Sequence, residues 1–317
     1  MADLKKLTIL HSNDMHGDFL AEEIDDDLVG GVSMLSGYLN KVRAEDPEAL
    51  YVIAGDMFRG SIIDAEYQGV STIEIMNYLA PDVVTLGNHE VDYGMAHLLF
   101  LEKCCKFPIV NANLYIKTTG MRIFNSHKVL RAAGMNILFI GIITEEIMAA
   151  AKNDNLMGTF VDINEAAEEV GKICDNYKSV DIDLTILLTH VGFEEDKKLA
   201  KLLMPEWGVD LIIGGHSHTL PEKPEEVNNI LIVQAGTGTN QIGRFDIVVD
   251  ADTNSVAEYK WQAVPISEKT CPRVLASSDY AIVEEYLLLH NHLMSRVEGR
   301  LEVLNGPNGY PNDIKGE

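Results

Sequence analysis

The sequence predicts an α/β protein with more than one β-sheet, and three features of the chain lead to that fold class. Apolar runs of strand length recur throughout, and continuous apolar strands are typical of sheets covered on both faces. Segments with helical periodicity lie between many of these runs, as in proteins whose strands and helices alternate. Residues 244–266 instead alternate in polarity on both sides of a turn at 251–254, which predicts an antiparallel hairpin. The sheets should therefore be at least partly mixed.

The individual elements follow from these patterns in chain order. The predicted strands are Leu7–Leu10, Tyr51–Ala54, Val83–Thr85, Ile137–Ile143, Leu184–Leu188, Leu211–Ile213 and Ile230–Val233. The predicted helices are Val32–Val42, Thr72–Leu79, Met95–Cys104, Asn164–Tyr177 and Glu194–Leu203. The acidic run Glu22–Asp27 lacks the residue spacing of a calcium-binding loop, so we expect a solvated loop there.

The end of the chain differs from the rest. The 317 residues suffice for one large domain or two small ones, and we expect one principal domain over residues 1–275. After Pro272 the sequence predicts an amphipathic helix over Tyr280–Val297, followed by a tail rich in Gly, Pro and Asn. That composition gives no natural end to a fold, so we expect residues 276–317 to begin a linker to a further domain.

The charge balance excludes several classes of partner. With 49 acidic and 25 basic residues the formal net charge is -24. Nucleic-acid polymers and anionic membranes are bound through cationic residues, so neither is an expected partner. An anionic substrate would be repelled unless a few basic residues or metal ions supply local positive charge.

The cysteines and the N-terminus predict the compartment. Cys104, Cys105, Cys174 and Cys271 show no zinc-finger spacing, and they are expected to be buried reduced thiols of a cytosolic protein. The first residues contain no long apolar segment, and no window is apolar enough to span a bilayer. We therefore expect a soluble, cytoplasmic protein, or an exported one if a leader has been removed.

Side chains with metal-binding chemistry follow five of the predicted strands. They are Asp14 and His16, then Asp56, then Asn88, His89 and Asp92, then His190, and finally His216 and His218. In α/β sheets the carboxyl ends of the strands are where ligands bind. Each cluster alone has a plain structural explanation as a turn, a helix cap or an exposed loop. Their occurrence at five strand ends of one chain favours a shared site.

The donor set indicates two metal ions. Asp, His and Asn without Cys suit Mn, Fe, Zn, Co or Ni. Even seven of these nine side chains are too many for one ion that keeps an open position, and they suit two ions that share a bridging carboxylate. Such ions would also supply the positive field that an acidic protein needs in order to bind an anion.

The order Asp-x-His, Gly-Asp, Gly-Asn-His-Glu, His, Gly-His-x-His resembles the calcineurin-like metallophosphoesterase superfamily. The stretches LTILHSNDMHGDF and PDVVTLGNHEVDYG resemble the paired signatures of its 5′-nucleotidase and 2′,3′-cyclic-nucleotide phosphodiesterase family. Gly30-Gly31, Asn111–Leu114 and Val233–Arg244 are similar to that family too, and the similarity covers roughly residues 5–265. The resemblance implies a four-layer α-β-β-α sandwich of two mixed sheets flanked by helices.

The resemblance also implies a role for each residue of the site. The first ion should be held by Asp14, His16, Asp56 and His218, and the second by Asp56, Asn88, His190 and His216, with Asp56 bridging. His89 would contact the scissile phosphate and protonate the leaving oxygen, and Asp92 would orient His89. Asn88 would also position the phosphate, and Arg59 is a candidate phosphate contact because a guanidinium suits such anions.

Some positions depart from the family pattern. Ser12 stands where the first signature usually has Thr or Ile, Val91 where the second usually has Phe, and His218 where some nucleotidases carry Gln or Asn. Members of the family usually continue into a second domain that binds the substrate, and nothing in this chain corresponds to it. We therefore expect residues 1–275 to be a metallophosphoesterase catalytic domain whose C-terminal substrate-binding domain is absent.

The expected function is the hydrolysis of phosphoesters at two divalent ions (Mn²⁺, Zn²⁺, Fe²⁺ or Co²⁺), with nucleotide 5′-monophosphates or related nucleotides as small-molecule substrates. Two alternatives stay open: a 2′,3′-cyclic-nucleotide or broad phosphodiesterase, and a non-catalytic module that binds metal without turnover. A structural role is expected for the other histidines, for Trp261 and for Glu90, with Glu90 capping a helix or supporting a ligand. Arg244 is a second arginine that suits a phosphate.

Overall fold

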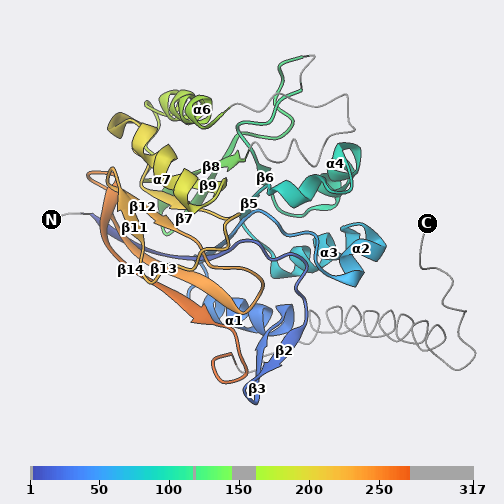
Figure 1. Ribbon diagram of the computed structural model, residues 1–317. Coiled ribbons are helices and arrows are strands. Elements are labelled where there is room, and N and C mark those ends of the chain that lie inside the picture. The colour runs from blue at the N-terminus through green and yellow to red at the C-terminus, as the bar shows by residue number, and fades with distance from the viewer. Residues whose placement is uncertain (1–2, 117–118, 145–161, 272–317) are drawn as a thin grey trace, which may run out of the picture.

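The computed structural model describes residues 3–116, 119–144 and 162–271, and two six-stranded sheets form its centre (Figure 1). The first sheet has the order β14 (Ser255–Pro265), β13 (Gln241–Asp250), β1 (Leu4–Ser12), β4 (Leu50–Ala54), β5 (Val83–Thr85) and β6 (Ile109–Val110). The second has the order β11 (Glu225–Val227), β12 (Ile230–Val233), β10 (Leu211–Ile213), β9 (Leu184–His190), β8 (Met135–Ile143) and β7 (His127–Ala132). The predicted helix Tyr280–Val297 and the boundary at residue 275 lie outside the described residues.

Both sheets are mixed. In the first, β1, β4, β5 and β6 run parallel, while β13 pairs antiparallel with β1 and with β14. In the second, β8, β9, β10 and β12 run parallel, and the edge strands β7 and β11 are antiparallel to their neighbours. Parallel neighbours end at the same edge of a sheet, so β1, β4 and β5 in one sheet and β9 and β10 in the other deliver their following loops to a common edge.

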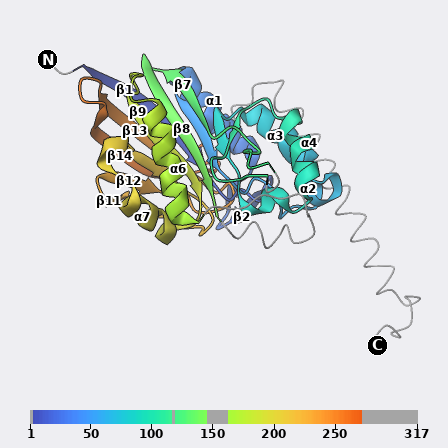
Figure 2. The same ribbon diagram turned by 90° about the horizontal axis from the view of Figure 1, so that it is seen from above.

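Helices cover the outer face of each sheet (Figure 2). On one side lie α1 (Val32–Glu45), α2 (Ile62–Tyr67), α3 (Val70–Leu79) and α4 (Met95–Cys104), and on the other lie α6 (Ile163–Asn176) and α7 (Phe193–Leu202). The predicted four-layer α-β-β-α sandwich is confirmed. Among the described residues no helix is both long enough and apolar enough to cross a membrane.

Three clusters of buried apolar residues fill the spaces between these layers. Leu7 and Ile9 of β1 belong to the cluster between the two sheets, and Leu10 belongs to the cluster beneath α1, α3 and α4. This division follows from the alternation of side chains along a strand. A third cluster joins α6 and α7 to the second sheet and contains Val170 and Leu199. The central strands β4, β9 and β10 are buried along their whole length because both of their faces are covered.

The helices and strands predicted within the described residues are present, with ends that differ by a few residues, and the hairpin of residues 244–266 is formed by β13 and β14. The expectation of a loop at Glu22–Asp27 was wrong. There β2 (Ala21–Ile24) pairs with β3 (Asp27–Gly30) in an antiparallel hairpin, and both turn residues, Asp25 and Asp26, have positive φ angles. Asp tolerates this conformation better than most residues do, and two such residues make a tight hairpin turn whose carboxylates stay in water.

Candidate active site

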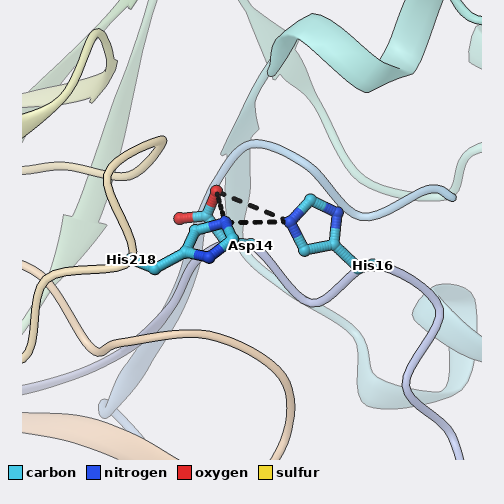
Figure 3. A group of neighbouring side chains, drawn as sticks. All are labelled: Asp14, His16 and His218. Carbon is cyan, nitrogen blue, oxygen red and sulfur yellow. Dashed lines mark hydrogen bonds and ion pairs between the residues drawn. The ribbon is translucent and has the colours of Figure 1, made fainter. Parts of the chain in front are cut away.

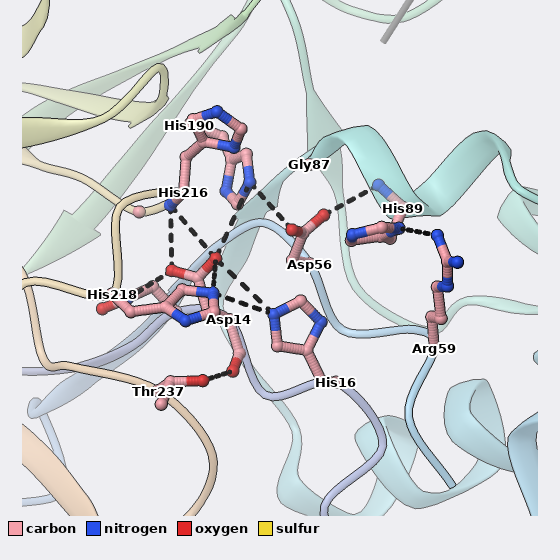
Figure 4. Close-up of polar contacts among 12 residues, drawn as sticks. Asp14, His16, Asp56, Arg59, Gly87, His89, His190, His216, His218 and Thr237 are labelled. Carbon is pink, nitrogen blue, oxygen red and sulfur yellow. Dashed lines mark hydrogen bonds and ion pairs between the residues drawn. The ribbon is translucent and has the colours of Figure 1, made fainter. Parts of the chain in front are cut away.

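The seven predicted ligands lie together at the edge where the parallel strands of both sheets end, and Figure 4 labels all of them except Asn88, which contacts His216. Asp14 and His16 follow β1, Asp56 follows β4, Asn88 begins the short 3₁₀ turn η1 (Asn88–Val91) after β5, His190 ends β9, and His216 and His218 follow β10. They come from two different sheets, so the stacking of the sheets brings them together. In sequence they are up to 204 positions apart, from Asp14 to His218.

The first group consists of Asp14, His16 and His218 (Figure 3). The Nε2 atoms of the two imidazoles are 3.1 Å apart, and Asp14 Oδ1 lies 3.4 Å from Nε2 of His218 and 3.9 Å from Nε2 of His16. Asp14 is fully buried. Two ring nitrogens and a carboxylate oxygen that converge in this way offer three lone pairs to one point, as ligands of a cation do.

The second group consists of Asp56, His190 and His216. Nδ1 of the fully buried His190 lies 2.8 Å from the carbonyl oxygen of Ala54. Since a carbonyl only accepts hydrogen bonds, Nδ1 carries a proton, and Nε2 of the neutral ring presents a lone pair to Asp56 Oδ2 at 3.0 Å. Asn88 Oδ1 lies 2.9 Å from Nδ1 of His216 and completes the predicted set.

A nitrogen lone pair and a carboxylate oxygen repel each other unless a proton or a metal cation lies between them. Burial lowers the pKa of His190, but the carboxylates of Asp56 and Asp14 and the carbonyl of Ala54 outweigh it and raise the pKa to about 9. Burial also raises the pKa of Asp56, yet His190 and the backbone N–H of His89 lower it to about 2. A divalent cation would replace the proton between the two side chains, so the donor set fits the two ions that the sequence predicts.

A third group, His16, Asp56 and His89, overlaps with the other two. Asp56 is thus common to two of the three groups, as a bridging carboxylate would be. The backbone N–H of His89 donates to Asp56 Oδ1 at 2.8 Å. Because the other carboxylate oxygen faces His190, Asp56 lies between the two halves of the site.

The backbone at the site adopts a conformation that is rare for residues other than glycine. Five of the seven predicted ligands have positive φ: 50° at Asp14, 51° at His16, 53° at Asp56, 82° at His216 and 52° at His218. Such a conformation costs of order 1–3 kcal/mol at each position and persists only where the surrounding structure enforces it. Strained residues of this kind cluster at functional sites.

Glu90 supplies part of that enforcement. Its fully buried carboxylate accepts hydrogen bonds from the backbone N–H groups of Asp56 (2.9 Å), Met57 (2.7 Å) and Gly87. It therefore joins the loop after β4 to the loop after β5. Burial and the nearby Asp56 raise the pKa of Glu90 to about 7, against the effect of these donors. The expectation that Glu90 supports a ligand agrees with these contacts.

His89 lies at the side of the site with Asp92 and Arg59 (Figure 4). Its Nδ1 is 2.8 Å from Asp92 Oδ2, so that carboxylate fixes the ring and keeps a proton on Nδ1. Nη1 of Arg59 donates to the same oxygen at 3.0 Å and lies 3.1 Å from His89 Nδ1. The backbone N–H of Arg59 is held at 2.8 Å by the buried carboxylate of Asp64, a residue that no sequence motif singles out.

The other candidates have different partners. Arg244 forms an ion pair with Asp246 at 3.0 Å and is not part of the three groups. His11 is fully buried and accepts a hydrogen bond from Trp261 Nε1 at 3.0 Å, so both residues have the structural role expected of them. Burial lowers the pKa of His11 to about 3.

Comparison with known proteins places these residues in a family. The family model described as calcineurin-like phosphoesterase matches residues 7–220. A 5′-nucleotidase-related protein of Glossina morsitans morsitans is 32% identical over 282 residues, which is 78% of this chain and 50% of that protein. The 5′-nucleotidase of Mus musculus is 34% identical over 230 residues, 68% of this chain and 38% of that protein.

Solved structures show the same fold. The 5′-nucleotidase precursor from Thermus thermophilus superposes with a TM-score of 0.80 at 25% identity, over 92% of this chain and 59% of that chain. This chain therefore spans about half the length, or less, of the curated relatives described above.

Proposed function

The chain belongs to the calcineurin-like phosphoesterase family, and from that membership we propose that it hydrolyses nucleotide-like phosphoesters at a centre of two divalent metal ions. The observation that carries this proposal is the pair of adjoining ligand groups, Asp14–His16–His218 and Asp56–His190–His216, in which nitrogen and oxygen lone pairs converge. Divalent metal ions are a general feature of the family's chemistry, and Mn²⁺, Zn²⁺, Fe²⁺ and Co²⁺ all accept carboxylate and imidazole ligands.

Each side chain has a proposed part in holding the ions. The first ion takes Asp14, His16, Asp56 and His218, and the second takes Asp56, Asn88, His190 and His216. When bound, the two ions would lower the pKa of a water molecule and neutralise charge on the attacking and leaving oxygens. They would also attract an anionic substrate to a protein with a formal net charge of -24.

His89 and its neighbours serve the leaving group. His89 contacts the scissile phosphate and gives a proton to the leaving oxygen from Nε2, since Nδ1 is engaged by Asp92. Asp92 is a positioning residue that holds the ring in this orientation. Arg59, 63% exposed in its side chain, supplies a fixed positive charge beside the ring and contacts the phosphate. Asn88 positions the phosphate as well as the second ion.

Nucleotide 5′-monophosphates are the proposed substrates, because relatives of this chain carry the name 5′-nucleotidase. A cyclic-nucleotide or broad phosphodiesterase activity is the alternative. We assign the catalytic centre to a domain of residues 1–275 and substrate selection to a further domain beyond it. On this assignment, the catalytic domain should turn over small phosphoesters.

The experiment is a turnover assay on purified protein with Mn²⁺. AMP, a cyclic nucleotide, p-nitrophenyl phosphate and its bis ester are compared, and a chelator should abolish all hydrolysis. His190→Ala and Asn88→Ala should lose most activity, while His127→Ala, a half-buried histidine on β7 that contacts Tyr177, serves as control. Full turnover in both site variants would disprove the proposal. Bound metal without turnover in the wild type would indicate a binding module instead.

A further inference from the structure

The loop of residues 214–219 carries two metal-binding candidates that belong to different ions. His216 is assigned to the second ion and His218 to the first, and both have positive φ angles. Ser217 and His218 are exposed to solvent, so their position is not fixed by burial. Hydrogen bonds from neighbouring segments must therefore hold this loop if its two imidazole rings are to stay at a fixed separation.

Gln234, which follows β12, provides several of these hydrogen bonds. Its side chain is fully buried. Its Nε2 donates to the carbonyl of Gly215 at 3.0 Å, and its Oε1 accepts from Ser217 Oγ at 3.0 Å and from the backbone N–H of Thr219 at 3.1 Å. Nε2 also lies 3.4 Å from Oδ2 of the buried Asp196. An amide offers two hydrogens and two lone pairs, so all of its capacity is used, mostly on this one loop.

The residues after Gln234 hold Asp14 from the other sheet. The carbonyl oxygen of Asp14 accepts from Thr237 Oγ1 at 2.9 Å and from the N–H of Gly238 at 2.8 Å (Figure 4). The side chain of Asn13 bridges the N–H of Ala235 and the carbonyl of Gly236, each at 2.7 Å. Asn13 Nδ2 also donates to Asp14 Oδ2 at 2.6 Å. Residues 234–238 thus support Asp14 and both histidines, although they contain no ligand.

We infer that Gln234 is a positioning residue of the metal centre: it fixes the loop between Gly215 and Thr219 and ties it to the segment that holds Asp14. This inference rests on the proposed function. A neutral amide suits the task because it offers donors and acceptors at once beside buried carboxylates, and it adds no charge to the site.

The first ion should depend on Gln234 more than the second. The second group has anchors of its own: His190 is bonded to Ala54, and the backbone N–H of His216 donates to Asp14 at 2.9 Å. His218 instead depends on Ser217 and Thr219, which Oε1 of Gln234 holds together with the backbone N–H groups of Phe193 and Gly236. Loss of the amide should therefore release His218 before His216.

The test measures Mn²⁺ binding itself, by calorimetric titration and by electron paramagnetic resonance of the protein loaded with two equivalents. Gln234→Met keeps the length of the side chain and removes its hydrogen bonds. We expect about 10- to 100-fold weaker binding at one of the two sites, and a spin-coupled pair that gives way to a single bound ion. Ser217→Ala removes the hydrogen bond to Gln234 together with those to the backbone N–H of Phe193 and the hydroxyl of Thr219, and about 2- to 10-fold weaker binding is expected.

The matched control is Asp183→Asn. Asp183 is buried at the opposite edge of the same sheet, immediately before β9, and pairs with Lys5 at 3.0 Å. This variant should lower Tm and keep wild-type Mn²⁺ affinity. Wild-type affinity at both sites in the Ser217 and Gln234 variants would overturn the inference alone. A wild-type protein that binds no Mn²⁺ would overturn the proposed function as well.

Discussion

Gly87→Ala tests how closely the loops after β4 and β5 pack at the proposed metal centre. Gly87 has an ordinary negative φ of -106°, so alanine meets no backbone penalty there. A Cβ atom would, however, lie 2.1 Å from Asp56 Oδ1 and 2.3 Å from the backbone nitrogen of Asp56. Contacts of Cβ below 3.0 Å essentially do not occur, so the two loops must separate by about 0.9 Å.

That displacement acts on the carboxylate proposed to bridge both ions. A misplacement of about 1 Å at a catalytic site costs roughly 10²-fold in rate. We expect Gly87→Ala to lose about 10²-fold in kcat/KM for p-nitrophenyl phosphate with Mn²⁺ and to bind Mn²⁺ more weakly in calorimetry. Gly208→Ala is the control, because it adds a methyl group in open space at a positive φ of 63°. Wild-type kcat/KM and affinity in Gly87→Ala would refute the proposed position of Asp56.

Three further predictions concern catalysis, metal linkage and stability. His89→Ala should keep its metal content, measured by mass spectrometry, and lose about 10²- to 10⁴-fold in kcat, since only a proton donor is removed; loss of metal would contradict its assignment. Mn²⁺ at 100 times its Kd should stabilise the wild type by about 2.7 kcal/mol per site, seen as a rise in Tm that His190→Ala reduces; an equal rise in the variant would argue against His190 as a ligand. Glu169→Gln should lose about 1–3 kcal/mol at pH 7, because Glu169 pairs with Arg122 and Lys172. Those partners lower the pKa of Glu169 in the folded protein against the effect of burial. The contribution of Glu169 to the free energy of unfolding is therefore fully present above its ordinary pKa of 4.5, and it is lost as the pH falls through the pKa of the folded state. Urea unfolding at pH 7 and at pH 3 measures this, and a difference that grows at low pH would contradict it.

Local pattern accounts for much of the site. Asp14, Asp56 and Asn88 each follow an apolar run, and parallel neighbouring strands end at one edge of a sheet. The types of the candidate ligands and the sheet edge at which they gather could therefore be predicted from the sequence. The hairpin at Glu22–Asp27 was not, because its charged residues hide the alternation that marks a strand.

Other features have no local signature. The hydrogen bond that holds Arg59 comes from Asp64, whose role depends on the packing of α2, and the tie between Asp14 and the segment after Gln234 crosses from one sheet to the other. Sequence periodicity does not predict such contacts, because each one joins a single side-chain group to a single backbone group. The similarity of Val233–Arg244 to a family motif singled out this segment, but it did not indicate that the segment holds Asp14.

The α/β class and the metal-binding residue types at the strand ends could be predicted from the amino-acid order, since periodicity and apolar runs act over a few neighbouring residues. The four-layer arrangement was implied by the resemblance to a known family and not by these patterns. Which of the metal-binding residues meet depends on the folded chain. Burial of apolar side chains such as Ile9 and Phe139 packs the two sheets together, and that packing brings Nε2 of His190 to 3.0 Å from Oδ2 of Asp56.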